Sequence, residues 1–263
     1  MDQLEGRNPV IEALLRKKRR VLKILLDRGA KADPKVDRLL ALAEEGRVPI
    51  ERVDRARLDK LAEGRVHNGV IAQAEPLPEW TSGALVQQVF MEGRKPFFVM
   101  ADELSYEHNL GAILRSSLGF GVDGLFLPSQ RGAAISSVVQ RVAMGAAEVV
   151  PIVREGLFSS VKQIRSAGIP VIGADMGGES IYAMDLRGPV AFVLGGEGKG
   201  LSPTLRNKCD AIASIPLHGG LESLNVSVAG AVMMAEKRRQ DGWFGPVPPP
   251  TPRARAPKDD SAG

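Results

Sequence analysis

The chain has 263 residues, of which 44% are hydrophobic and 25% charged, which is typical of a globular protein with one large domain or two small ones. No stretch approaches the roughly 18 consecutive apolar residues of a membrane span. The acidic start MDQLEG differs from a secretory signal, so we expect a cytoplasmic protein with no membrane partner. The single cysteine, Cys209, excludes an internal disulfide, and three scattered histidines predict no metal site.

Positive charge is concentrated near the N-terminus. Residues 1–70 hold 17 Lys and Arg against 12 Asp and Glu, whereas the rest of the chain sums to −1. Polyanions bind dense cationic clusters by releasing counterions, which makes the densest run a candidate RNA-binding site. The alternative is a solvated helix end, where cations interact favourably with the helix dipole. The residues of this run are Arg16, Lys17, Lys18, Arg19 and Arg20.

The first 76 residues predict a compact α/β unit. Apolar periodicity and turn signals predict helices at about 7–17, 33–45 and 54–62 and strands at 21–26, 48–53 and 69–74. Pro76 and Pro78 then break regular structure, so we place the end of this domain at residue 76. Residues 77–95 predict a linker with one helical stretch.

From residue 96 short apolar strands alternate with helices, which predicts an α/β domain with a parallel sheet covered on both faces. The expected strands lie at 97–102, 123–128, 149–153, 170–175, 189–195 and 211–216, and the expected helices near 109–119, 133–143, 157–167, 201–207 and 225–240. This domain ends at residue 242. Residues 243–263 are rich in proline and charge and are expected to be disordered.

Three loops at strand ends contain residues that a core alone would not need. Ligands of open α/β sheets bind beyond the carboxyl ends of the strands, so these loops predict a binding site. The first is HNLGAILR at 108–115, in which Arg115 offers a fork of donors suited to a phosphate or a carboxylate. Alternatively, Asn109 is an ordinary helix N-cap and Arg115 an exposed helix residue.

The second loop is LGGEGKG at 194–200, whose four glycines allow a ligand to approach the backbone closely. It has no Ser or Thr after the lysine, unlike a P-loop, and does not match G-x-G-x-x-G. The carboxylate of Glu197 suits a cationic or hydroxyl-bearing ligand, of which a sulfonium cofactor is one. A tight strand-to-helix turn is the alternative.

The third loop, IPLHGGLESLNVS at 215–227, joins a strand end to the last helix through a glycine turn. Ser223 and Asn225 can cap that helix, and they are equally placed to contribute to a site. Small and apolar residues follow, which favours close packing of the helix against the preceding loops.

Together, HNLGAILR, LGGEGKG and IPLHGGLESLNVSVAG resemble, in order and spacing, the three motifs of the SpoU (TrmH-like) branch of the SPOUT RNA methyltransferases. GRNPVIEAL at 6–14 and VLKILL at 21–26 resemble the substrate-binding domain, similar to ribosomal protein L30e, of members that act on large-subunit ribosomal RNA. The resemblance covers about 5–240 and is closest to the group that methylates a guanosine of 23S rRNA.

The resemblance implies methyl transfer from S-adenosylmethionine to a ribose 2′-hydroxyl of RNA, with no metal and no DNA partner. It also implies a homodimer and a deep trefoil knot near residues 190–225, which sequence patterns alone cannot show. The substrate that it favours is large-subunit rRNA.

The resemblance also assigns roles to residues of this chain. Arg115 matches the catalytic arginine, Asn109 its motif partner, Glu197 the acid of the second motif, and Ser223 and Asn225 the polar pair of the third. Because a guanidinium keeps its proton in proteins, we expect Arg115 to hold phosphate and hydroxyl in line, oriented by Glu197. The implied cofactor pocket is walled by Leu194, Gly195, Gly196, Ile215, Leu217 and Leu224.

Two departures from the family pattern leave the target nucleotide open. Leu104 to Glu107 replace a segment in which an aspartate-proline pair is common, and His218-Gly219-Gly220 replaces a more apolar turn. The alternatives are a tRNA 2′-O-methyltransferase and a non-catalytic RNA-binding or ribosome-assembly protein. A nucleotide-dependent oxidoreductase would need G-x-G-x-x-G after the first strand of the sheet, where this chain has DELSYEHNLG.

Overall fold

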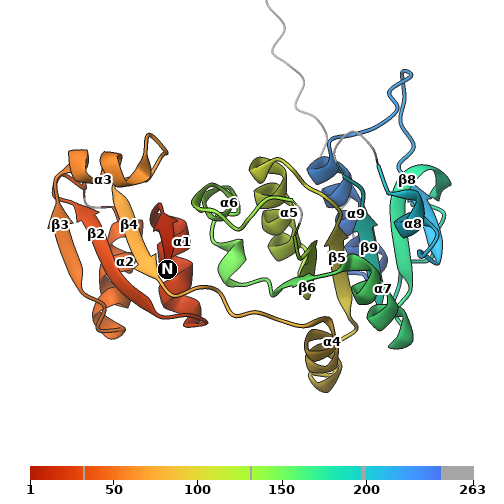
Figure 1. Ribbon diagram of the computed structural model, residues 1–263, viewed down its shortest axis with the longest axis horizontal. Coiled ribbons are helices and arrows are strands. Elements are labelled where there is room, and N and C mark those ends of the chain that lie inside the picture. Colours follow the sequence, from red (N-terminus) through yellow and green to blue (C-terminus); the bar gives the residue numbers. More distant parts are fainter. Residues whose placement is uncertain (32, 131, 197–199, 244–263) are drawn as a thin grey trace, which may run out of the picture.

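The computed structural model describes residues 1–31, 33–130, 132–196 and 200–243 and contains two separate sheets (Figure 1). Glu197 and residues 244–263 lie outside the described residues, and so do the predictions made for them. The helices and strands expected from the sequence are all present, with changed ends in several cases.

The N-terminal unit has a four-stranded sheet in the order β1-β4-β2-β3. The strands are β1 (Asp2–Glu5), β2 (Val21–Asp27), β3 (Ile50–Val53) and β4 (Val70–Ala74). Strands β2 and β3 are parallel and the other pairs are antiparallel. Strand β1 was not predicted, because four residues at the chain start are too few to show an alternating pattern.

Helices cover both faces of this small sheet. Helices α1 (Arg7–Arg16) and α2 (Pro34–Glu45) pack on one face around Leu4, Ile24 and Leu26, and α3 (Arg55–Ala62) packs on the other around Leu25 and Ile71. The predicted start of α2 is confirmed, since the Asp33 carboxylate accepts hydrogen bonds from the N–H groups of Lys35 and Val36.

The second sheet has six parallel strands in the order β10-β8-β9-β5-β6-β7, which confirms the predicted parallel α/β architecture. Its strands are β5 (Phe97–Ala101), β6 (Gly124–Pro128), β7 (Ile152–Glu155), β8 (Val171–Ser180), β9 (Val190–Leu194) and β10 (Ala211–Ser214). Strand β7 begins later than the predicted residue 149. The N–H groups of Val149 and Val150 both donate to the Ala146 carbonyl, which closes the 3-10 turn η1 (Ala146–Glu148) and leaves neither for the sheet.

Alternate side chains of the central strands point to opposite faces of the sheet and pack into two separate cores, as a parallel sheet buried on both faces requires. Phe97, Val99 and Phe192 face α5 (Glu107–Gly119), α6 (Ser137–Val142) and α9 (Val226–Gln240). Phe98 and Met100 face the opposite core, to which α4 (Ser82–Met91), α7 (Leu157–Ser166) and the short α8 (Pro203–Arg206) contribute.

The chain changes direction across the sheet between the adjacent strands β5 and β9. After β5 it continues to α5 on one face, whereas after β9 it continues to Leu201 and α8 on the other. A crevice at the carboxyl edge opens at such a switch point and is the usual ligand site of doubly wound sheets.

Strand β8 departs from its neighbour β10 in mid-strand. Ile212 of β10 pairs with Gly173, but the next residue, Ala213, pairs with Glu179. Residues 174–178 therefore bulge out of the ladder at the carboxyl edge of the sheet. The sequence predicted the end of this strand at residue 175, whereas the strand continues past the bulge to Ser180.

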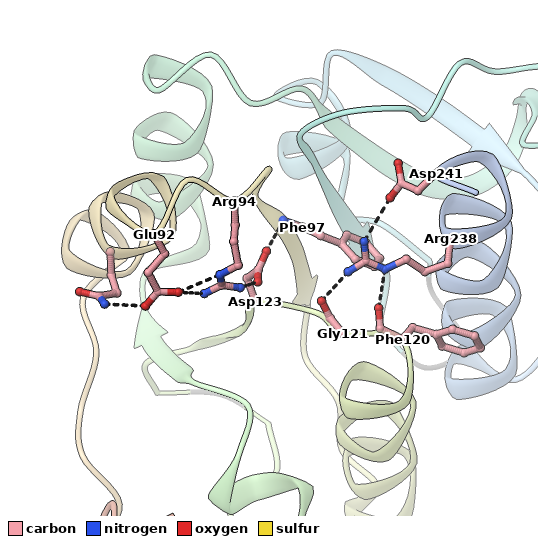
Figure 2. A network of polar contacts seen from close by, with 9 residues as sticks. Glu92, Arg94, Phe97, Phe120, Gly121, Asp123, Arg238 and Asp241 are labelled. Atoms are coloured by element: carbon pink, nitrogen blue, oxygen red, sulfur yellow. Dashed lines mark hydrogen bonds and ion pairs between the residues drawn. The ribbon is translucent and has the colours of Figure 1, made fainter. Parts of the chain in front are cut away.

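A polar network anchors the C-terminal helix α9 to the opposite, amino edge of the sheet (Figure 2). The Arg238 guanidinium donates to the carbonyls of Phe120 and Gly121, both at 2.6 Å, and lies 4.9 Å from the ring centroids of Phe97 and Trp243. Close by, the Asp123 carboxylate accepts from the N–H of Phe97 at 2.8 Å. The end of α9 is thus bonded to the turn between α5 and β6.

Candidate functional site

A pocket of about 610 Å³ lies at the carboxyl edge of the second sheet, at the switch point between β5 and β9. Its walls come from four places: the start of α5, the bulge of β8, the end of β9, and the segment from β10 to α9. This volume is ordinary for a small-molecule ligand site. The six residues predicted to form the cofactor pocket all line it, namely Leu194, Gly195, Gly196, Ile215, Leu217 and Leu224.

Two asparagines join the first and third sequence motifs inside this pocket. Asn225 Nδ2 donates to Asn109 Oδ1 at 3.0 Å, and both residues line the pocket together with Ser223. Asn225 also caps α9, because its Oδ1 accepts from the N–H of Ser227 at 2.9 Å. It is therefore both a helix cap and a pocket residue.

Asn109 is not the helix N-cap that the sequence allowed as an alternative. Helix α5 begins two residues earlier, at Glu107, with Tyr106 in the N-cap position. Asn109 therefore lies within the first turn, where its side chain is directed to Asn225 and the pocket.

In the glycine-rich turn after β9, the backbone at Gly195 and Gly196 lies close to the backbone at Gly200. The N–H of Gly196 donates to the Gly200 carbonyl at 3.0 Å, and a Cβ on Gly195 would lie 2.3 Å from the Gly200 carbonyl carbon. Position 195 therefore excludes every side chain. Backbone groups and neighbouring apolar side chains, among them Leu194 and Ile215, form this side of the pocket.

Several further residues of the pocket were not predicted as site residues, among them Asp175 and Tyr106. Asp175, on the β8 bulge, forms an ion pair with Arg206 and accepts from the N–H of Met176 at 2.8 Å. Tyr106 contributes an aromatic side chain that is 68% exposed. The signal for Asp175 was in the sequence: it follows the apolar run PVIGA, and polar residues at the carboxyl ends of such strands are site candidates.

Arg115 does not line the pocket. Six helical residues span about 9 Å and turn through about 240°, so Arg115 leaves α5 in a different direction from Asn109. Its side chain is exposed. The exposed-helix alternative therefore describes the position of Arg115 among the described residues of the single chain.

The N-terminal basic run divides into two groups. Arg16, Lys17, Lys18 and Arg20 are exposed, with Arg16 paired to Glu12 and Lys17 to Glu45. The side chain of Arg19 is only 1% exposed and pairs with Glu148 of the second unit. Arg19 is therefore withdrawn as an RNA-binding candidate, because RNA in solution cannot contact a buried guanidinium.

The described residues do not suggest a metal site or a membrane helix. Among them, no three His, Cys, Asp or Glu side chains are grouped so that they could hold a metal ion. Likewise, none of the helices in the described part of the chain is long and apolar enough to cross a membrane. Burial and the nearby Asp210 raise the pKa of the Cys209 thiol to about 11, which makes it a poor nucleophile at neutral pH.

Two family models match this chain. The model described as the SpoU rRNA Methylase family matches residues 96–235, and the model for RNA 2′-O ribose methyltransferase substrate binding matches residues 3–80. The 23S rRNA (guanosine-2′-O-)-methyltransferase RlmB of Pseudomonas putida is 37% identical over 91% of this chain and 98% of its own. The RlmB of Pseudomonas aeruginosa is also 37% identical, over 88% and 93%.

Solved structures share the fold. The SpoU methyltransferase AviRb of Streptomyces viridochromogenes, in complex with AdoMet, has a TM-score of 0.75 at 24% identity and covers 90% of this chain and 89% of its own. A putative RNA methyltransferase of the TrmH family from Porphyromonas gingivalis has a TM-score of 0.70 at 25% identity, covering 91% and 90%.

Proposed function

Because the chain belongs to the SpoU rRNA methylase family, we propose that it transfers a methyl group from S-adenosylmethionine to the 2′-hydroxyl of a guanosine in 23S rRNA. The observation that carries this proposal is the pocket at the switch point, into which all three motifs contribute side chains. The substrate is the one named for the RlmB relatives, which align over almost the whole chain.

The residues of the pocket fit S-adenosylmethionine. Leu194, Ile215 and Leu224 offer apolar surface for an adenine ring, and the turn at Gly195 and Gly196 offers backbone groups. The Asp175 carboxylate, held by Arg206, suits either a ribose hydroxyl or the positive charge of a sulfonium. When bound, the cofactor supplies a methyl group on a positively charged sulfur.

The chain's own task is to align the ribose hydroxyl and to accommodate its proton. In the reaction a bond would form between the 2′-oxygen and the methyl carbon as the sulfur–carbon bond breaks, and the hydroxyl proton would pass to solvent water. Asn109 and Asn225 form a hydrogen-bonded polar pair in the wall of the pocket, and we assign to this pair the alignment of the hydroxyl. Arg115 would hold the phosphate of the target nucleotide, since its guanidinium is a fixed cation with a fork of donors.

The proposal includes three finer features of the family. They are a trefoil knot around residues 190–225, an N-terminal unit of L30e-like form, and a homodimer. The match of residues 96–235 to the SpoU rRNA Methylase family supports the knot, and the mixed sheet of the N-terminal unit supports its form. The exposed side chains of Leu217, Leu221 and Val228 near the pocket support a second copy on this face, as does Arg115 outside its own pocket.

The proposed domains are 1–76 for RNA binding, 77–95 as a linker and 96–242 for catalysis. The exposed cations Arg16, Lys17, Lys18 and Arg20 remain RNA-binding candidates. Removing positive charge from the N-terminal unit, and not from the second unit, would distinguish RNA binding from catalysis.

The experiment is transfer of tritiated methyl from S-adenosylmethionine to unmodified 23S rRNA and to bulk tRNA, followed by mapping of the labelled ribose. We expect label in a single 2′-O-methylated guanosine of the rRNA. Label in tRNA alone would support the proposed 2′-O-methylation but would show that the substrate is tRNA and not 23S rRNA. Absence of label from both RNAs, with cofactor binding intact, would favour a non-catalytic RNA-binding protein.

A further inference from the structure

The guanidinium of Arg19 is saturated with hydrogen bonds. An arginine has five N–H donors, and all five of Arg19 are used. Nε and Nη2 donate to the two oxygens of Glu148, Nη2 also donates to Gln140 Oε1 at 3.0 Å, and Nη1 donates to Asp2 and to the Glu75 carbonyl. The side chains of Arg19 and Glu148 are each 1% exposed.

The partners of Arg19 come from both units of the protein. Asp2 and Glu75 belong to the N-terminal unit, whereas Gln140 is on α6 and Glu148 is on η1. Figure 1 shows α1, which leads to Arg19, beside α6 at the junction of the two units. Arg19 is therefore the centre of the contact between the units.

Contacts on either side of Arg19 make the junction continuous. Lys18 Nζ donates to the Val149 carbonyl at 2.6 Å. At Gly145, between α6 and η1, a Cβ would lie 2.6 Å from Glu12 Cγ, so α1 packs directly on this backbone. At the junction of the two units, the hydrogen-bonded guanidinium of Arg19 is thus flanked by tightly packed backbone.

The second-unit side of this junction is connected to the pocket through α5. Helix α6 packs on α5 so closely that a Cβ on Gly111 would lie 2.6 Å from Val142 Cβ. Helix α5 also carries Asn109 into the pocket. The elements that hold Arg19 are therefore packed on the helix that brings the first motif to the pocket.

We propose that Arg19 is a positioning residue that determines specificity: its bonds to Glu148 and Gln140 fix the N-terminal unit relative to the pocket and so select which ribose of a bound RNA reaches it. This inference rests on the proposed function for its RNA, but its structural part concerns the protein alone. It replaces the expectation that Arg19 itself binds RNA.

The chemistry of the contact between Arg19 and Glu148 indicates that it orients the two units more than it stabilises the fold. Burial raises the pKa of Glu148, and Arg19 opposes that rise, as expected for a carboxylate whose removal from water is costly. Buried ion pairs often stabilise a protein no more than apolar side chains of similar volume would. The planar fork with five fixed donors, in contrast, accepts only one arrangement of its partners.

The test compares three forms of the full chain with the wild type. Arg19→Lys keeps the charge but loses the fork. The double variant Arg19→Met with Glu148→Leu fills the junction without charge, and so avoids leaving one buried charge unpaired if the single variant folds poorly. Arg187→Lys is the matched control, since it makes the same change at an exposed arginine whose ion pair, with Asp185, involves neither the junction nor the pocket.

The first measurement is the distribution of distances between spin labels on α2 and α7 in the protein without RNA. We expect a narrow distribution for the wild type and Arg187→Lys and a broadened one for Arg19→Lys and the double variant. A distribution as narrow as that of the wild type in both junction variants would overturn the inference. This measurement does not depend on the proposed reaction.

The second measurement is methyl transfer to 23S rRNA with mapping of every labelled ribose. We expect kcat/KM at the main site to fall by about tenfold to a hundredfold in both junction variants, mainly through KM, with label at additional riboses. The Kd for S-adenosylmethionine should stay within about twofold, because the pocket is untouched. If the double variant labelled the same single ribose as the wild type, whereas Arg19→Lys labelled additional riboses, Arg19 would be a structural residue only. Loss of labelling by the wild type would instead refute the proposed function.

Discussion

At the scale of single residues, Asn225 joins a structural role to a chemical one. Its Oδ1 caps α9 and its Nδ2 holds Asn109, so substitutions can separate the two roles. Serine is a good N-cap but is too short to reach Asn109. Asn225→Ser should therefore change the free energy of unfolding by less than about 0.5 kcal/mol, whereas Asn225→Ala should lower it by about 1 kcal/mol.

Both substitutions at Asn225 should reduce methyl transfer by on the order of tenfold or more, because both remove the bond to Asn109. Urea denaturation and methyl-transfer kinetics measure the two effects separately. Full activity in Asn225→Ser, with activity lost in Asn225→Ala, would show that Asn225 acts as a helix cap only.

Cys209 provides a prediction of pH dependence at the same scale. Its pKa of about 11 in the folded protein lies above the value of about 8.5 for a free thiol. At pH 8 only about one folded thiol in a thousand is ionised, against roughly a quarter in the unfolded chain, so native Cys209 should react with iodoacetamide on the order of a hundredfold more slowly.

The raised pKa of Cys209 also affects stability at high pH. Its contribution to the free energy of unfolding is fully present below about pH 8.5 and is lost as the pH rises toward 11, since only the unfolded thiol ionises in that interval. Cys209→Ala should remove this part of the pH dependence, as measured by urea unfolding at several pH values. An identical slope in the variant would contradict the assignment.

At the scale of elements, the anchoring of α9 depends on Arg238 (Figure 2). This helix begins at the pocket with Asn225 and ends at the opposite edge of the sheet, where Arg238 donates to Phe120 and Gly121. Arg238→Met should lower the free energy of unfolding by about 2 to 3 kcal/mol, because it leaves two carbonyls without their charged donor and removes the cation–π contacts.

Arg239→Met is the matched control for Arg238→Met. Arg239 lies on the same turn and is 61% exposed, and its buried partner Glu236 keeps a second donor, Gln240 Nε2, at 2.8 Å, so the loss of Arg239 should lower the free energy of unfolding by less than the loss of Arg238. Chemical denaturation of both variants measures the difference. Equal destabilisation by the two substitutions would mean that the positive charge at this end of α9 matters, and not the hydrogen bonds of Arg238 to Phe120 and Gly121.

At the scale of the whole molecule, the proposed roles of Arg115 connect catalysis with assembly. It is exposed on α5 and lies outside its own pocket, so its proposed partner is the RNA phosphate or a second chain. Arg115→Ala should abolish methyl transfer, while the Kd for S-adenosylmethionine should remain within about twofold. Calorimetry and methyl-transfer assays test this division, and lost cofactor binding would refute it.

The proposed homodimer has its own test. Light scattering should give twice the 28.2 kDa mass of the chain for the wild type and for Arg115→Ala. A monomer that still methylates rRNA would show that the exposed apolar residues near the pocket have another partner.

The sequence by itself determined the order of helices and strands after β1, the parallel sheet and the three loops of the pocket. These features follow from local patterns, because a buried strand must be apolar along its length and a site must lie where strands end. The six residues of the expected cofactor pocket, which the resemblance to the SpoU family implied, also lie along one cavity.

Only the tertiary structure decided how distant residues meet. The bulge that brings Asp175 to the pocket depends on the register between β8 and β10. The direction of Arg115 depends on where α5 starts, and the burial of Arg19 depends on two units packing together. A basic run and an arginine in a motif look the same in sequence whether they face solvent or a partner, because burial is a property of long-range contacts and not of local pattern.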